Sequence, residues 1–233
     1  MQSLNLDPNG LWLGRIERPG VGPCVVTLRE GVVTDITSKA APTVRDILEM
    51  DDAVSYLRNA PGKAVEPHDG QFAWLSPCDL QVVKACGVTF AGSMGERVIE
   101  EQAAGDPAKA DAIRGRIGAR IGDSLSNITP GSAEAEVVKQ ALIEEGLWSQ
   151  YLEVGIGPDA EVFSKAQVLS SVGAGAEVGL HPISTWNNPE PEVVLAVTSK
   201  GIIKGATLGN DVNLRDVEGR SALLLSKAKD NNA

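Results

Sequence analysis

The stretch Asn188–Asp216, NPEPEVVLAVTSKGIIKGATLGNDVNLRD, predicts a strand, a tight turn and a second strand. The apolar and largely β-branched run Val193–Val197 is typical of a buried strand. Ser199-Lys200-Gly201 has the chemistry of a turn, and Ile202 resumes strand character. The sequence therefore predicts a β-hairpin that ends close to Asp211.

Acidic side chains stand at both outer ends of this predicted hairpin. Glu190 and Glu192 are separated by one residue, and alternate residues of an extended chain point to the same face. The hairpin returns the chain so that Asp211 can join them. Three converging carboxylates repel one another unless a cation lies between them, and such oxygen ligands favour Mg²⁺, Mn²⁺ or Ca²⁺ over zinc. An isolated E-x-E is more often a solvated strand face, but the N-D cluster favours a metal site.

The order of these motifs resembles the metal site of the fumarylacetoacetate hydrolase family. That family has roughly E-x-E, a hydrophobic strand and then G-Y-T-x-x-N-D-x-x-x-R-D, and this chain has E-P-E and then G-A-T-L-G-N-D-V-N-L-R-D. The gap of 19 residues from Glu192 to Asp211 is like that of the family. The resemblance implies a divalent metal on Glu190, Glu192 and Asp211, while Ala206 replaces the family's Tyr.

The resemblance covers most of residues 75–233 and implies a β-rich catalytic fold of the α+β or mostly β class. We expect a small N-terminal β-rich domain at 1–70 and the catalytic domain at 71–233. In the first, 11–16, 24–28 and 32–36 are predicted strands, the last two forming a hairpin, and 43–58 is a predicted helix. The family's barrel continues further, so we expect the chain to stop before the fold is complete.

The middle of the chain is predicted to be a buried strand at 82–88 followed mainly by helices. Residues 96–126 are rich in helix formers, and a lid could occupy 92–125. Ser132 is a predicted N-cap, and the helix after it is expected to run to about Tyr151 with Val137 on its apolar face.

The segment after the predicted strand 82–88 resembles the family's G-x-N-Y-x-x-H-x-x-E entry. Thr89, Phe90 and Ser93 fall on its Asn, Tyr and His, and Glu96 falls on its Glu. The resemblance implies that the first three contact the substrate and that Glu96 is the catalytic acid or base. With Ser93 in place of the His, the chain lacks the His–Glu pair with which hydrolytic members of the family activate water. Glu96 could instead only charge the start of a helix.

Two lysines and two further polar residues complete the candidate site. Lys165 in F-S-K and Lys227 in K-x-x-D match family lysines, which implies substrate-binding or catalytic roles. Asn210 and Arg215, in the N-D and R-D pairs, are candidate substrate-binding residues. Surface positions are the alternative for the lysines. We expect the two histidines to be structural and Trp186 to pack beneath the metal-bearing strand.

Composition narrows the class of protein. The 233 residues are 42% hydrophobic and 22% charged, as in an ordinary globular protein, and the net charge is −10. That acidity argues against nucleic-acid binding. No apolar run approaches the roughly 20 residues of a membrane span, and no signal peptide is evident. Three cysteines without metal spacing are expected to be free thiols, and the protein is predicted to be cytoplasmic.

The wider pattern, including S-P-C-D-L-Q-V-V-K-A-C-G-V-T-F-A and E-R-V-I-E-E-Q, is similar to the family branch of sugar-acid catabolism. The resemblance implies a Mg²⁺-dependent dehydratase, a hydro-lyase that acts on a 2-keto-3-deoxypentonate through a metal-stabilised enolate. The first alternative is a C–C bond hydrolase of a 2,4-diketo-3-deoxy sugar acid or another acylpyruvate. The second, of another class, is a non-catalytic metal-binding protein. We also expect a homodimer or a higher homo-oligomer.

Overall fold

The computed structural model describes residues 4, 6–65, 72–87, 98–99, 102–103, 106–121, 128–148, 150–218, 220–231 and 233. The chain divides into two compact units, Met1–Lys84 with Ser164–Ala233 and Ala85–Phe163. The predicted boundary near residue 70 differs from this division, because the first unit combines N-terminal and C-terminal segments. Among the described helices, none has both the length and the apolar character to cross a membrane.

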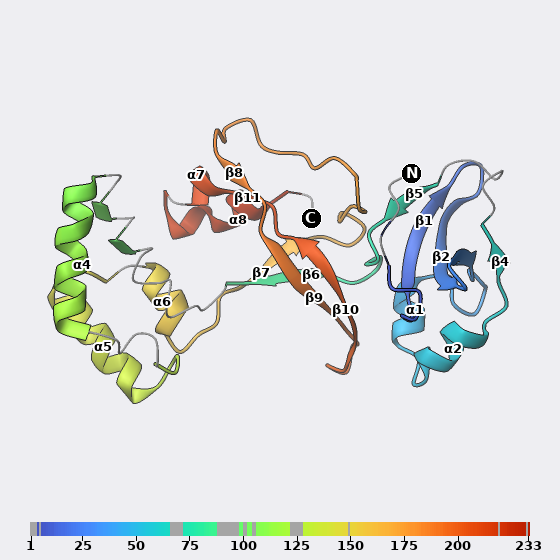
Figure 1. Cartoon of the computed structure of the whole chain (residues 1–233), viewed down its shortest axis with the longest axis horizontal. Helices are drawn as coiled ribbons and strands as arrows, with labels where there is room; N and C mark the ends of the chain where they lie inside the picture. Colours follow the sequence, from blue (N-terminus) through green and yellow to red (C-terminus); the bar gives the residue numbers. More distant parts are fainter. Residues whose placement is uncertain are drawn as a thin grey trace. The chain divides into compact units, whose positions relative to one another are not determined.

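The N-terminal part of the first unit is an antiparallel sheet of five strands in the order β4-β3-β2-β1-β5 (Figure 1). Its strands are β1 (Leu13–Arg18), β2 (Gly22–Arg29), β3 (Val32–Asp35), β4 (Lys63–Ala64) and β5 (Ala73–Leu75). The predicted hairpin of β2 and β3 is confirmed. Glu30 and Gly31, with φ of 51° and 79°, join the two strands in a two-residue turn with the positive φ values that a hairpin favours.

Two short helices pack against this sheet, α1 (Val44–Leu48) and α2 (Ala53–Asn59). The prediction of one helix over 43–58 is therefore wrong. The helix stops at Glu49, and the Asp52 side chain caps a new start by accepting a hydrogen bond of 2.9 Å from Ser55 N. The buried side chains of the two helices form one core together with residues of the sheet and the loops. This core consists of Val25, Ile36, Ala41, Val44, Ile47, Ala53, Leu57 and Ala60.

The second unit contains the helices α4 (Pro107–Ile121), α5 (Ala133–Glu144) and α6 (Gln150–Ile156). The predicted cap is confirmed, since Ser132 Oγ accepts a hydrogen bond of 3.1 Å from Ala135 N. A single helix to Tyr151 is wrong, because the chain leaves the helix at Gly146 with φ of 65°. Val137, expected on the apolar face, is exposed. The buried core of this unit is Val98, Ile99, Ala103, Ile113, Ala135, Leu142, Leu147, Leu152 and Ile156.

Strands β6 (Val83–Cys86) and β7 (Val162–Ala166) pair with each other, and the division into units falls within both strands. The sequence predicted a buried strand at 82–88. The structure has a strand at Val83–Cys86, but this strand is mostly not buried. Within β6 only Ala85 is buried, and Lys84 is exposed with its Nζ donating to Ser164 Oγ at 2.7 Å.

The C-terminal part of the first unit is built on two short antiparallel pairs. Strand β9 (Pro191–Val197) pairs with β10 (Ile203–Asn210), which confirms the predicted hairpin, and β8 (Asn187–Asn188) pairs with β11 (Asn213–Leu214). Helix α7 (Arg215–Glu218), a 3-10 turn (Ala222–Leu224) and α8 (Leu225–Lys229) follow. Leu214, Val217 and Ala228 form the small core that fixes these elements.

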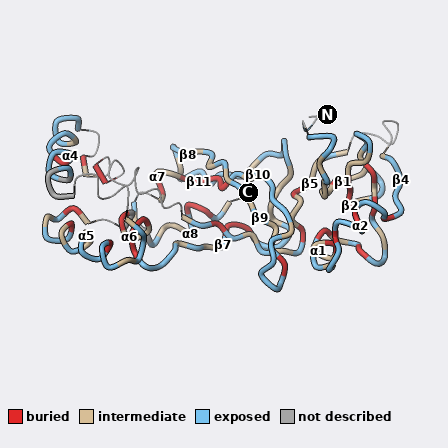
Figure 2. The backbone as a smooth tube through the Cα atoms, turned by 60° about the horizontal axis from the view of Figure 1, so that its bottom comes forward, coloured by how far each residue is buried: buried red, intermediate tan, exposed pale blue. Residues whose placement is uncertain are grey.

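The expectation that 193–197 is buried is wrong. Burial alternates along β9, and Val193, Leu195 and Val197 are exposed. Figure 2 colours the two strands of the hairpin exposed or intermediate. The physical reason is that side chains alternate along a strand, so Val193, Leu195 and Val197 share one face of the hairpin, and the described part of the chain leaves that face uncovered. An apolar run fits a strand, but its burial depends on partners that lie elsewhere in the structure.

Candidate metal site

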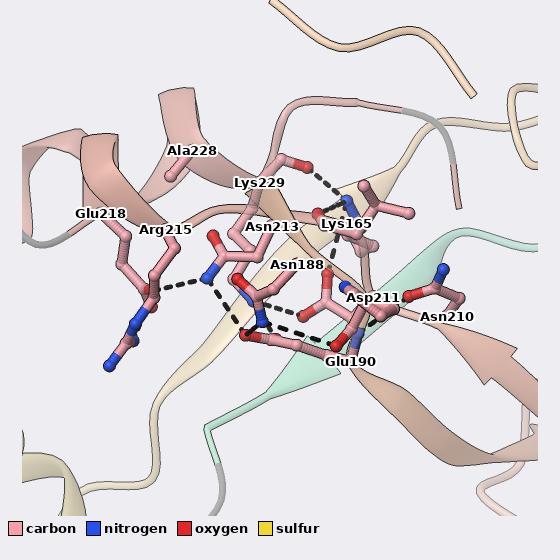
Figure 3. A network of polar contacts seen from close by, with 12 residues as sticks. Lys165, Asn188, Glu190, Asn210, Asp211, Asn213, Arg215, Glu218, Ala228 and Lys229 are labelled. Atoms are coloured by element: carbon pink, nitrogen blue, oxygen red, sulfur yellow. Dashed lines mark hydrogen bonds and ion pairs between the residues drawn. The ribbon is translucent and has the colours of Figure 1, made fainter. Parts of the chain in front are cut away.

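The three carboxylates that the sequence singled out converge at the open end of the β9–β10 hairpin. Figure 3 shows two of them, Glu190 and Asp211, with Lys229. Glu190, Glu192 and Asp211 each offer an oxygen, and these oxygens lie within 4.8 Å of one another. Two hydrogen bonds of 2.9 Å close this end, from Asp211 N to Glu190 O and from Glu190 N to Asn210 Oδ1. The hairpin thus holds all three acids at one point.

Lys229, the last residue of α8, reaches into this cluster. Its Nζ donates to Glu190 Oε2 at 2.5 Å and to Asp211 Oδ2 at 2.8 Å, and its side chain is buried. Burial opposes the charge of Lys229, but hydrogen bonds to Asp211 and Glu190 outweigh it and raise the pKa. Lys229 is therefore a fixed ammonium group at the centre of the acidic cluster.

Lys165 on β7 supports the cluster from inside the protein. Its Nζ donates to Lys229 O at 2.7 Å, to Val212 O at 2.9 Å and to Asn231 Oδ1 at 2.7 Å. The same atom lies 3.4 Å from Asp211 Oδ1. Burial lowers the pKa of Lys165, and the Asp211 charge opposes that shift only in part. Lys165 thus links β7 to the segments on both sides of the cluster.

Glu192 is the least compensated of the three acids. Among the described residues, none donates a hydrogen bond to its carboxylate. Burial raises the pKa of Glu192, and the negative charges of Asp211 and Glu190 raise it further. Three carboxylates face two ammonium groups, so the ionised cluster carries an uncompensated negative charge.

Asn213 holds the outer side of Glu190. This residue is fully buried on β11, and its Nδ2 donates to Glu190 Oε1 at 3.1 Å and to Glu218 Oε2 at 2.6 Å. Arg215 in turn donates to the same Glu218 oxygen at 3.1 Å. Arg215, a predicted substrate-binding residue, is therefore engaged with Glu218 in this structure.

Asp216, the aspartate of the R-D pair, binds the segment that leads into β8. Asp216 Oδ1 accepts from Ser184 Oγ at 2.6 Å, and Oδ2 accepts from Thr185 N at 3.0 Å. The hydrogen bond from Ser184 is the largest cause of a lowered Asp216 pKa. Trp186 next to this anchor is 61% exposed, so the expectation that it packs beneath the strand is wrong.

The structure does not bring every predicted residue to the cluster. Lys227 is exposed on α8 and forms no ion pair with the carboxylates within the described part of the chain, whereas Lys229 lies between Glu190 and Asp211. Asn210 is exposed and uses its side-chain oxygen on Glu190 N. The predicted residues Thr89, Phe90, Ser93 and Glu96 lie outside the described residues.

Sequence reasoning missed Lys229 because K-x-x-D spacing favoured Lys227. Residues two apart on a helix point in nearly opposite directions, so only one of these lysines can face the acids. The packing of Ala228 in the core with Leu214 and Val217 turns Lys229 inward. That packing depends on tertiary contacts, and only the alternation of small and charged residues in LSKAKD hints at it.

No family model matches the chain. A region of 95 residues, 40% of the chain, is 38% identical to a "Probable 2-keto-3-deoxyxylonate dehydratase" of Haloferax volcanii and covers 32% of that protein. A region of 69 residues, 30% of the chain, is 38% identical to the 2-dehydro-3-deoxy-D-arabinonate dehydratase of Saccharolobus solfataricus and covers 23% of it. The matches thus span about a third or less of these curated relatives.

Solved structures of 2-keto-3-deoxy-D-arabinonate dehydratase share the fold of this chain. The form complexed with magnesium and 2,5-dioxopentanoate matches with a TM-score of 0.56 at 18% identity, over 93% of this chain and 60% of that one. The apo form matches with the same TM-score at 17% identity, over 93% and 61%. At these identities the likeness establishes a mixed α/β fold with sheets. Membership of the fumarylacetoacetate hydrolase family stays a prediction.

Proposed function

We propose that the chain belongs to a Mg²⁺-dependent hydro-lyase that removes water from a 2-keto-3-deoxy sugar acid, with a pentonate as the substrate. The observation that carries this proposal is the convergence of Glu190, Glu192 and Asp211 beside Lys229. The names of the relatives support the reaction, and the magnesium complex of the structural neighbour supports the metal.

The residues present fit a divalent cation. All three donors are hard carboxylate oxygens, the ligand type that Mg²⁺, Mn²⁺ and Ca²⁺ prefer. Asp211 Oδ1 is buried and accepts no hydrogen bond from the residues that the structure describes, and Lys165 Nζ lies 3.4 Å away as an ion-pair partner. The uncompensated negative charge of the cluster also favours a cation. Glu190, Glu192 and Asp211 would hold it, and Mn²⁺ or Ca²⁺ could replace Mg²⁺.

When bound, the cation would polarise the 2-keto oxygen and make the C3 proton of the substrate more acidic. The raised pKa of Lys229 keeps its ammonium group charged, so Lys229 is suited to hold a substrate carboxylate and unsuited to act as a base. Lys165 Nζ is buried and donates to oxygens of Val212, Lys229 and Asn231, so we infer that it positions Asp211 and the end of α8.

The proton steps need an acid or base that the cluster does not supply. Dehydration removes a proton from C3 and the hydroxyl from C4, and the two leave together as water. We propose Glu96 for this transfer on the resemblance of its segment to the family's entry motif. A carboxyl group that closes over the substrate would lose water around it, which raises its pKa toward the working range.

The test is to incubate the purified full-length protein and Mg²⁺ with 2-keto-3-deoxypentonates and to identify the products by mass. A product lighter by one water supports the proposal. Cleavage of a 2,4-diketo-3-deoxy sugar acid into two products, with no conversion of the pentonate, would contradict the proposal and show a C–C bond hydrolase instead. No conversion of either substrate would favour a metal-binding protein without activity.

A further inference from the structure

We propose that Asn213 is a positioning residue that fixes which oxygen of Glu190 is offered to the cation, an inference that rests on the proposed metal site. Asn213 is fully buried and touches a predicted metal ligand without belonging to the carboxylate cluster. Its role would be to hold Glu190 in one orientation, so that a single oxygen faces the other two acids.

The amide of Asn213 has two donors, and both are used on carboxylates. Nδ2 donates to Glu190 Oε1 at 3.1 Å and to Glu218 Oε2 at 2.6 Å. The opposite orientation of the amide would place Oδ1 against two carboxylate oxygens, which is repulsive. Oδ1 instead points away from both acids (Figure 3). It is buried and has no hydrogen-bond partner in the described part of the chain. The two carboxylates therefore determine the orientation of the amide.

The contact divides the two oxygens of Glu190 between separate tasks. Oε1 accepts from Asn213, whereas Oε2 faces the cluster and accepts from Lys229 at 2.5 Å. Asn213 thus holds Glu190 so that it faces the cluster through Oε2.

Glu218 and Arg215 hold the amide from the other side. Arg215 Nη1 donates to Glu218 Oε2 at 3.1 Å, so a charge-assisted hydrogen bond fixes the acceptor that Asn213 uses. The chain Arg215–Glu218–Asn213–Glu190 runs from α7 through β11 to the start of β9. Groups that orient a metal ligand in this way tune metal affinity although they never touch the metal.

The structure offers a matched control. Asn188 lies directly opposite Asn213 in the pairing of β8 with β11, and its Nδ2 is 3.5 Å from the same Glu190 oxygen. That distance is at the outer limit of a hydrogen bond, so Asn188 contributes far less than Asn213. Leucine has the branched shape of asparagine without its polar atoms, so both variants remove a contact with Glu190 Oε1, and Asn213→Leu also removes the contact with Glu218.

The experiment measures Mn²⁺ affinity of the full chain and of both variants by calorimetry. Asn213→Leu should weaken binding by about 10–100-fold, the usual effect of losing a group that orients a ligand. Asn188→Leu should weaken it by less than about threefold, because its contact is marginal. A folded Asn213→Leu protein with unchanged affinity overturns the inference. A wild-type protein that binds no Mn²⁺ instead overturns the proposed function.

A second readout follows the contact in the metal-free protein. With ¹⁵N-labelled asparagine side chains, the Asn213 amide signals are identified by their loss in Asn213→Leu. They should move on Glu190→Gln, which removes the charge that they face, and move little on Glu192→Gln. If the chemical shifts of the Asn213 amide are unchanged in Glu190→Gln, the inference is overturned. Asn213→Ala replaces the leucine variant, both for identifying the signals and for measuring the affinity, if the leucine variant does not fold.

Discussion

At the scale of single residues, Glu192 is the acid whose surroundings depend most on a cation. Its carboxylate has no donor among the described residues, and two neighbouring negative charges add to the cost of its burial. Glu192→Gln should abolish Mn²⁺ binding and reduce turnover by about 10²-fold or more, because a Lewis acid contributes several kcal/mol. The metal-free variant should be at least as stable as the wild type, which thermal unfolding measures.

The matched control is Glu177→Gln, which changes an exposed carboxylate outside the cluster. Its Mn²⁺ affinity and turnover should equal those of the wild type. A Glu192→Gln protein that still binds Mn²⁺ tightly would show that this carboxylate is not a ligand.

The raised pKa of Glu192 also predicts how binding depends on pH. A proton on this carboxyl group competes with the cation, so Mn²⁺ affinity should increase as pH rises through the Glu192 pKa and level off above it. For the metal-free protein, the expected pH dependence of stability has the opposite sign. The contribution of Glu192 to the free energy of unfolding is present below the ordinary glutamate pKa and is lost as pH rises through the raised pKa. Affinity that falls with rising pH would contradict this assignment.

Residue by residue, the acids of the site could be predicted and the lysine could not. Glu190 and Glu192 share a face because an extended chain alternates its side chains, and the hairpin returns Asp211 to them. The choice between Lys227 and Lys229 depends on the rotation of α8. Burial of Ala228 determines that rotation through contacts distant in sequence.

At the scale of elements, two glycines should respond to the same substitution with opposite signs. Gly31 has φ of 79° in the β2–β3 turn, whereas Gly115 lies within α4, and an added Cβ meets nothing within 4 Å at either position. Gly31→Ala should lower the free energy of unfolding by about 1 kcal/mol or more, because alanine resists positive φ. Gly115→Ala should raise it by about 0.5–1 kcal/mol.

Urea unfolding of the two alanine variants checks this pair, and each variant is the control for the other. Equal changes of the same sign would mean that one of the two backbone conformations is not as described. Turn chemistry of this kind is local, which is why the two hairpins could be predicted. The break between α1 and α2 depends on the cap at Asp52 within a continuous helical pattern, so the sequence did not reveal it.

At the scale of the whole molecule, the sequence could not predict whether a strand face is buried, because burial depends on which other segments pack against that face. The β9–β10 hairpin leaves a wide apolar face exposed, with Val193 at 69% and Leu208 at 82%. A contiguous exposed apolar patch commonly marks an interaction surface. We therefore keep the proposal that the protein forms a homodimer or a higher homo-oligomer.

Light scattering of the full-length protein at micromolar concentration tests that proposal. The expected mass is a multiple of the chain mass, and Leu208→Glu should reduce it if the exposed face of the hairpin lies in the interface. A monomer at these concentrations would contradict the proposal. An oligomer that Leu208→Glu leaves intact would place the interface elsewhere.

The central claim is that Glu190, Glu192 and Asp211 hold one divalent cation, and anomalous diffraction from Mn²⁺-soaked crystals tests it most directly. The account predicts one strong peak, about 2.1 Å from an oxygen of each carboxylate, as for Mg²⁺. Glu190 should contribute Oε2, with Oε1 still on Asn213. Absence of a peak at full Mn²⁺ saturation, or a peak away from these three acids, would contradict the account.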